Sequence, residues 1–322
     1  MASPASEWIL TFVGTGNLNS QTSRSQAAVL LEAAGCNYLF DCGDGTADRL
    51  RKLGKSAIDV IAVSELSSTA MAGILTVAEL NRHHGRRPAI VLGPAGLTGA
   101  LASLANLSSS SFEELFLVDE RGHGTALECR SGIFLESVPV DVGELSTANA
   151  YLIYESAIQG KIDAKLGTRL GLKGADYGLI QAGQTVRGVR PADIVGPPQL
   201  GRRLVIGARG RQTQSLLEAL EGSDVAVLAA PFMDERLQVA MESYFFTGWE
   251  AAELLAGCRV KFALLTQLGP SAATWIQLAE ARQYYLSVNA PSDGQSVEIP
   301  LPSRGLPSFA NAVSRGQQRT TN

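Results

Sequence analysis

The sequence predicts an α/β fold in which helices cover the faces of β-sheets. Short β-branched or apolar runs alternate with stretches of helical periodicity along the chain. Strand-like runs occur in both halves, which indicates two sheets within one domain. The length of 322 residues and the hydrophobic content of 45% suit a globular protein with a large core, as one large domain or two small ones.

The predicted elements follow one another along most of the chain. The strand candidates are residues 8–13, 27–31, 38–40, 60–63, 89–92, 132–139, 150–154, 204–206, 225–228, 262–266 and 297–299. The helix candidates are residues 45–53, 71–82, 95–106, 212–221, 249–257 and 271–282. Gly257 follows the run AAELLA, where a glycine commonly ends a helix.

Two segments lack these patterns. Residues from about 156 to 200 are rich in glycine and poor in periodicity, which predicts an inserted arm. The tail of residues 302–322 is polar and has no periodic apolar face, so we expect disorder there. The sequence therefore predicts one layered domain over residues 1–301, with an arm inserted in it and a tail after it.

Composition indicates the compartment. No apolar run reaches the roughly 18–20 residues that span a bilayer, and the N-terminal MASPASEWILTFVG lacks the basic and long apolar regions of a secretory signal. The cysteines are widely spaced, with no CxxC pair, which favours reduced, buried thiols; they are Cys36, Cys42, Cys129 and Cys258. We expect a cytoplasmic protein, or one from an organelle interior if a targeting segment has been removed.

The loop of residues 63–73, VSELSSTAMAG, lies between a predicted strand and a predicted helix. Loops in this position often carry catalytic side chains. A serine nucleophile needs an adjacent base and an oxyanion hole, and this loop contains no histidine. We therefore expect Ser64, Ser67 and Ser68 to cap the following helix rather than to react.

The other polar candidates favour structural roles. His83 and His84 come at the end of a predicted helix, where a cation suits the helix dipole. His123, in ERGHGT, fits a surface turn. Asp41 and Asp44, in FDCGDGT, are expected to act as loop-shaping acceptors at the start of the next helix rather than as catalysts.

Several segments in the same order resemble one family. FVGTGNLNSQTSRSQAAVLLE and YLFDCGDGTADRLRKLG resemble the N-terminal signature of the ribonuclease Z (tRNA 3′-endonuclease) family of metallo-β-lactamase-fold proteins. The resemblance continues through GKIDAKLGTRLGLKGADYGLIQAGQTV, DIVGPPQLGRRLVI, DVAVLAAPF, EAAELLAGCRVKFALLTQL and SDGQSVEIP. It spans about residues 8–300 and implies a four-layer αβ/βα metallo-β-lactamase sandwich.

The resemblance fails at the metal ligands. In this family the loop after the strand reads THLHGDHIAGL and supplies ligands for two zinc ions. Of that motif, this chain keeps the structural glycine, Gly73. The positions that correspond to the family's ligands are occupied by Glu65, Ser67, Thr69, Ala70, Val142, Arg209, Phe245 and Gln267.

These residues change the chemistry of the pocket. Zinc is held by nitrogen, thiolate or carboxylate donors, usually four per ion. A permanent cation at Arg209 would repel two dications. Without zinc, no bound water has its pKa lowered to about 7, so the hydrolytic nucleophile is missing. The resemblance thus implies a pocket without metal or other cofactor and without catalytic residues.

Charge is distributed unevenly. Residues 161–211 contain ten Lys and Arg but three acids, a formal charge of +7, which leaves −11 on the rest of the chain. A basic stretch on an acidic body is typical of contact with a phosphate backbone. In ribonuclease Z relatives the corresponding arm grips the elbow of tRNA. The resemblance therefore implies binding of tRNA or another structured RNA by Lys161, Lys165, Arg169, Lys173, Arg187 and Arg190, with an acidic protein partner or an inert inherited arm as alternatives.

Family members are usually homodimers whose arm reaches over the partner's active site. The resemblance therefore implies a homodimer, or a heterodimer with a related subunit, and no membrane partner. The leading hypothesis is a catalytically inactive ribonuclease Z-like protein that keeps RNA binding, a subunit-interaction role, or both. The alternatives are a purely structural subunit of a larger assembly and an active zinc-dependent tRNA 3′-endonuclease.

Overall fold

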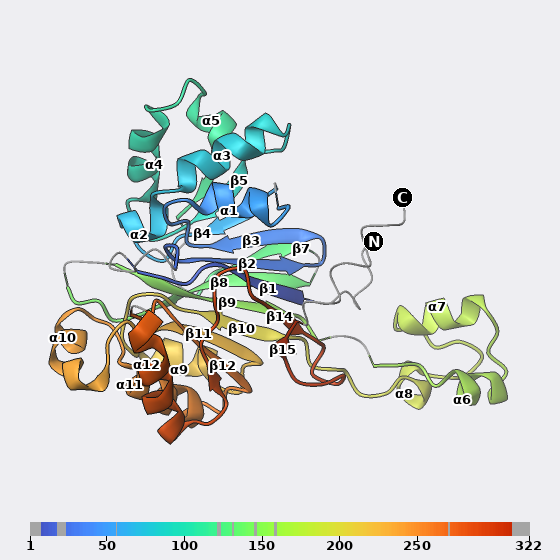
Figure 1. Ribbon diagram of the computed structural model, residues 1–322. Helices are drawn as coiled ribbons and strands as arrows, with labels where there is room; N and C mark the ends of the chain where they lie inside the picture. Colours follow the sequence, from blue (N-terminus) through green and yellow to red (C-terminus); the bar gives the residue numbers. More distant parts are fainter. Residues whose placement is uncertain are drawn as a thin grey trace.

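The computed structural model describes residues 8–17, 24–55, 57–120, 124–130, 132–144, 147–157, 160–269 and 271–310. Two β-sheets lie face to face, and helices cover the outer face of each (Figure 1). The four layers are therefore helices, sheet, sheet and helices, as the sequence predicts.

The first sheet has the strand order β15-β14-β1-β2-β3-β4-β5-β6 in the described residues. Its strands are β1 (Trp8–Gly14), β2 (Ala28–Ala33), β3 (Cys36–Phe40), β4 (Val60–Ala62), β5 (Ala89–Leu92), β6 (Phe116–Asp119), β14 (Ser296–Ile299) and β15 (Ser308–Phe309). The strands from β3 to β6 run parallel. The helices of this half are α1 (Thr46–Lys52), α2 (Ser68–Met71), α3 (Ile74–His83), α4 (Leu97–Ala105) and α5 (Phe112–Leu115).

The second sheet has the order β13-β12-β11-β10-β9-β8-β7. Its strands are β7 (Ala126–Arg130), β8 (Ile133–Pro139), β9 (Asn149–Glu155), β10 (Arg203–Ile206), β11 (Val225–Ala229), β12 (Phe262–Thr266) and β13 (Val288–Asn289). Its helices are α9 (Gln214–Leu220), the short 3₁₀ helix η1 (Asp234–Arg236), α10 (Leu237–Glu242), α11 (Gly248–Gly257) and α12 (Ser271–Tyr284). None of the helices in the described residues is long and apolar enough to span a membrane.

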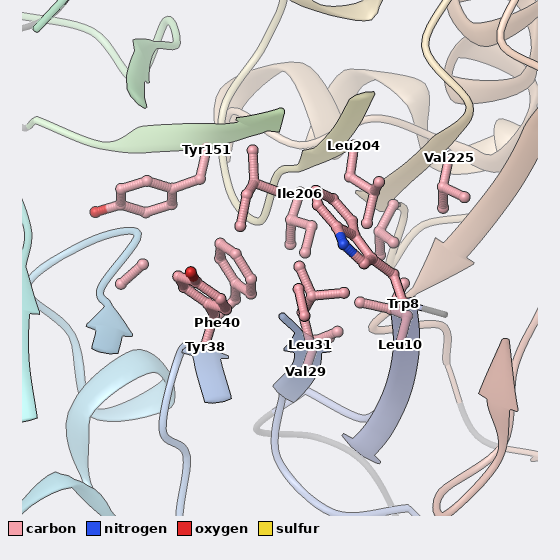
Figure 2. Packing of buried hydrophobic residues seen from close by; sticks show 14 of the residues in the cluster. Trp8, Leu10, Val29, Leu31, Tyr38, Phe40, Tyr151, Leu204, Ile206 and Val225 are labelled. Carbon is pink, nitrogen blue, oxygen red and sulfur yellow. The ribbon is translucent and has the colours of Figure 1, made fainter. Parts of the chain in front are cut away.

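The largest core lies between the two sheets. Figure 2 shows Trp8 and Leu31 of the first sheet facing Leu204 of the second. Because successive side chains of a strand point to opposite faces, Leu31 packs between the sheets whereas its neighbour Leu30 packs beneath the helices. Burial of each such side chain contributes about 1.5–3 kcal/mol. Double-sided burial explains why the strands are continuous apolar runs.

The arm leaves the body between β9 and β10 and extends away from both sheets (Figure 1). It contains α6 (Ala164–Arg169), α7 (Ala175–Gln181) and α8 (Pro191–Ile194). A small cluster of buried residues holds these helices together, made of Leu172, Ile180, Val189 and Ile194. The arm thus has its own packing, although its short helices gave no clear periodicity.

The C-terminal segment corrects one expectation. We predicted disorder from residue 302, but Val297 and Glu298 of β14 pair with Phe309 and Ser308 of β15. That prediction is wrong for residues 302–310, because the two-residue strand β15 depends on pairing with β14 and not on a pattern in its own sequence. Residues 311–322 lie outside the described residues. The cysteines are free thiols, as predicted, and three of the four are buried.

Candidate functional site

The loop of residues 63–73 follows β4, at the carboxyl edge of a run of parallel strands. In layered α/β folds, ligands commonly bind at this edge. Ser67 caps α2, since its hydroxyl accepts a hydrogen bond from the Ala70 amide at 3.4 Å. The capping role is confirmed for Ser67 and wrong for Ser64, whose hydroxyl donates to Asp41.

Asp41 fixes the start of this loop. One of its carboxylate oxygens accepts a hydrogen bond from the Ser64 amide at 2.8 Å, and the other accepts from the Ser64 hydroxyl at 2.9 Å. The pKa of Asp41 is raised to about 7, mainly because the carboxyl group is buried. Asp41 is a loop-shaping acceptor, as expected, but the loop that it orders is the one after β4. The predicted place at the start of α1 is wrong for Asp41 and Asp44, because Gly45 is the N-cap of that helix and no side chain caps it.

An ion pair joins two of the ligand-equivalent positions, Glu65 and Arg209. The Arg209 guanidinium lies 3.3 Å from the Glu65 carboxylate, and the side chains are 30% and 13% exposed. Ser67 donates a hydrogen bond to the same carboxylate at 3.0 Å. Arg209 also donates to the Ser243 carbonyl at 3.1 Å and lies 6.0 Å from the centre of the Tyr244 ring. The fold therefore brings together two of the ligand-equivalent positions, 144 residues apart in the chain.

The other ligand-equivalent positions have varied surroundings. Thr69 shares a 2.8 Å hydrogen bond with Ser67, while Ala70 and Val142 are buried apolar side chains. The ring of Phe245 packs against another phenylalanine, and its carbonyl accepts a hydrogen bond from Arg211. Of these positions, only Glu65 and its neighbours Ser67 and Thr69 form one connected polar group with Arg209.

Gln267 lines the same small cavity as Asp41. Its backbone is left-handed, with a φ of 55°, and its amide donates to the Thr15 carbonyl at 2.8 Å. Gln267, Asp41, Ser64 and Tyr151 line a small cavity of about 20 Å³. A cavity of that size has room for about one water molecule, and the polar lining suits one. It has no room for a substrate.

The donor set does not fit the two zinc ions that the fold family implies. Among the residues described, no three His, Cys, Asp or Glu side chains gather in a group that could hold a metal ion. Glu65 is the one carboxylate at a ligand-equivalent position, and it is already paired with a guanidinium. Because Arg209 cannot lose its proton in a protein, a metal would have to displace a permanent cation.

Four of the ten basic residues in the stretch 161–211 do not belong to the arm. Arg202 is 1% exposed, pairs with Glu155 at 2.9 Å and stacks over Trp8. Arg203 donates to carbonyls near the end of α9, while Arg209 and Arg211 pair with carboxylates of the body. The charge of +7 is therefore wrong as a property of the arm. Residues 160–200 carry six basic and three acidic side chains.

Within the arm, two of the six predicted RNA-binding residues are already paired. Arg187 pairs with Asp176 at 2.9 Å, and Arg190 pairs with Asp193 at 3.0 Å. The other four are exposed and have no ion-pair partner in the described part of the chain: Lys161, Lys165, Arg169 and Lys173. They recur at every fourth position, so the free charge of the arm is concentrated in and around α6.

The histidines lie outside the candidate pocket or outside the described residues. His83 and His84 are exposed at the end of α3, as predicted, with ring centres 5.7 Å apart. His123 lies outside the described residues. The prediction of a solvated helix end is thus confirmed for the first two.

One surface was not anticipated. Trp249 of α11 and Tyr284 of α12 are both exposed, and their ring centres lie 5.6 Å apart beside a hollow of about 430 Å³. The structure shows more exposed apolar residues on α12 than a purely solvated helix face would have: Trp275, Ile276 and Tyr284.

The chain is similar in sequence to proteins named ribonuclease Z. Ribonuclease Z of Myxococcus xanthus is 27% identical over 303 residues, covering 91% of this chain and 98% of that protein. Ribonuclease Z of Methanosarcina acetivorans is 27% identical over 312 residues, covering 90% and 98%. No protein-family model matches the chain.

The solved structures decide the fold. A metallo-β-lactamase fold protein of Bacillus subtilis superposes with a TM-score of 0.65 at 13% identity, over 91% of this chain and 99% of that one. The chain has the metallo-β-lactamase fold. The short form of human tRNase Z superposes with a TM-score of 0.63 at 18% identity, over 91% and 99%. The ribonuclease Z proteins of Myxococcus xanthus and Methanosarcina acetivorans are thus similar to this chain over about nine-tenths of its length.

Proposed function

We propose that this chain is a ribonuclease Z-like protein that does not hydrolyse RNA and that uses its arm to contact structured RNA. The ion pair between Glu65 and Arg209 carries the first half of the proposal. It neutralises the carboxylate that could begin a metal site and puts a guanidinium where the family resemblance implies a metal ligand. The pocket then has no metal to lower the pKa of a bound water to about 7.

The residues present also do not support a metal-independent hydrolysis with a serine nucleophile. The Ser64 hydroxyl donates to Asp41 in a buried position, and the Ser67 hydroxyl is engaged with Glu65 and Thr69. A reactive serine needs a base that a third group orients and access to the substrate. Ser64 and Ser67 serve as internal hydrogen-bonding groups, which leaves neither of them free to attack a phosphodiester.

The arm supports the second half of the proposal. Four unpaired cations at a spacing of four residues offer a row of phosphate contacts in the described part of the arm: Lys161, Lys165, Arg169 and Lys173. Such contacts are sequence-independent and weaken steeply with salt, by about 0.9 log unit of affinity per phosphate contact for each log unit of salt.

Two measurements test the proposal. Purified full-length protein is incubated with zinc and desalted, and then assayed for bound zinc and for trimming of a precursor tRNA, with an active ribonuclease Z as the positive control. We expect substoichiometric zinc and no trimming. Stoichiometric zinc together with metal-dependent trimming would instead favour the active endonuclease.

RNA contact is measured by fluorescence anisotropy with a labelled tRNA at several salt concentrations. The variant Lys165→Glu/Arg169→Glu/Lys173→Glu should weaken binding and flatten the salt dependence by about three phosphate contacts. The matched control reverses three exposed cations of the body, Lys52, Arg86 and Arg87, and should bind like the wild type. No binding by the wild type, or equal loss in both variants, would favour the purely structural role.

A further inference from the structure

Residues of α10, α11 and α12 line a hollow of about 430 Å³ on the body of the protein, at the end away from the arm (Figure 1). Pockets for small organic ligands commonly have volumes of about 300–1,000 Å³. Leu237 and Trp249 give the hollow an apolar lining, and both side chains are exposed. Tyr284 packs against Trp249, with the ring centres 5.6 Å apart. The hollow therefore has the size and the aromatic wall of a small-molecule site.

The charged part of the lining is acidic. Three carboxylates line the hollow and, in the described part of the chain, no Lys, Arg or His does. Glu250 already has a counter-charge, because it pairs with Arg211 at 2.5 Å. Asp234 and Glu280 have no ion-pair partner among the described residues. The hollow thus contains two carboxylates without a counter-ion from the described protein.

These two carboxylates belong to one group of hydrogen bonds. The Asp234 amide donates to the Glu280 carboxylate at 3.5 Å, and the Trp249 amide donates to the Asp234 carboxylate at 3.3 Å. Burial, with the neighbouring charges of Asp234 and Glu235, raises the pKa of Glu280. The guanidinium of Arg236, the cation nearest in the sequence, lies over a phenylalanine ring, 5.5 Å from its centre. A cation from outside the chain would therefore relieve the repulsion between these carboxylates.

A guanidinium on an alkyl stem complements both parts of the hollow. Its planar fork has five N–H donors, so it can bond to two neighbouring carboxylates, and its faces stack on aromatic rings. Among aromatic side chains, the indole of tryptophan attracts a cation most strongly. We propose that the hollow binds a small alkylguanidinium molecule, with the head group at the two carboxylates and the stem against Leu237 and Trp249.

A second copy of the same surface does not fit as the occupant. Two facing hollows would bring carboxylates of like charge together, which is unfavourable. The inference goes beyond the proposed function, and the hollow shares no residue with the arm. Binding in the hollow and RNA contact by the arm can therefore succeed or fail independently.

The test titrates butylguanidinium into the full-length protein by isothermal titration calorimetry. Butylurea is the comparison, because it has the same shape and no charge. We expect butylguanidinium to bind about tenfold more tightly than butylurea, and its affinity to fall as the salt concentration rises. Equal affinities, or no binding of butylguanidinium, would overturn the inference.

Variants locate the binding. Asp234→Asn/Glu280→Gln removes both charges, keeps the size of the side chains and should lower the affinity for butylguanidinium about tenfold. Trp249→Leu keeps an apolar side chain without the ring face and should lower it about threefold. The matched control Asp44→Asn/Glu113→Gln neutralises two exposed carboxylates in the other half of the protein and should bind like the wild type. An unchanged affinity in the first variant, or an equal loss in the control, contradicts binding in the hollow.

The same head group also occurs on arginine side chains of other proteins. N-acetylarginine N-methylamide presents that side chain on a peptide backbone. A site for a small ligand should bind it no more tightly than butylguanidinium. Binding about tenfold tighter would assign the hollow to a peptide segment and overturn the small-molecule assignment.

Discussion

The pH dependence of stability offers a quantitative test of the loop that Asp41 organises. Burial raises the pKa of Asp41 to about 7 in the folded protein, from 3.8 in the unfolded chain. A raised acid pKa means that folding favours the protonated form. Its stabilising contribution is therefore fully present below pH 3.8, declines as the pH rises, and is lost above pH 7.

The substitution Asp41→Asn removes this titration, and asparagine tolerates the left-handed φ of 56° at this position. A shift of about three pKa units corresponds to about 4 kcal/mol in total, of which about 3 kcal/mol falls between pH 5 and pH 8. Urea unfolding of both proteins across this range should show the wild type losing that amount relative to the variant. If the unfolding free energies of the wild type and the variant changed in parallel with pH, Asp41 would not have the raised pKa of a buried carboxyl. Asp44→Asn is the control and should keep the wild-type profile, because it leaves Asp41 in place.

Three further substitutions test ion pairs and packing within the body of the protein. Glu65→Ala leaves Arg209 without its carboxylate partner and should lower the unfolding free energy by about 1–2 kcal/mol, since both side chains are only partly buried. Arg202→Ala removes a buried guanidinium and strands its partner carboxylate, so urea unfolding should show a loss of about 3–5 kcal/mol. Gly73→Ala would put a Cβ 2.4 Å from the Gly43 carbonyl oxygen, and thermal unfolding should show a loss of about 1–3 kcal/mol from overpacking.

Each of these has its contradicting result. Unchanged stability of the Glu65→Ala variant would mean that the ion pair is too solvated to matter. A loss for Arg202→Ala no larger than that for exposed Arg86→Ala would contradict the place of Arg202 in the core. A Gly73→Ala variant as stable as the wild type would show that the backbone at Gly43 and the backbone at Gly73 can move apart at little cost in free energy.

The main elements could be predicted because their patterns are local. The predicted helix 249–257 corresponds to α11, and the predicted strand 262–266 coincides with β12. The short edge strands β13 and β15 were missed, since two-residue strands depend on pairing partners rather than on their own composition.

The charge of the arm could not be predicted from sequence alone. Arg202 and Lys161 look alike in a count of charges, yet one is in the core and the other is exposed. Likewise, the resemblance could indicate that positions 65 and 209 lack the family's own ligands, but not that their side chains contact each other. Both depend on tertiary contacts that no local pattern encodes.

Zinc content measured on purified protein, before and after incubation with excess zinc, tests the central account most directly. A guanidinium paired with Glu65 should keep the metal far below one ion per chain, whatever the loading. Tight, near-stoichiometric zinc that survives desalting and is lost on Glu65→Ala would contradict it.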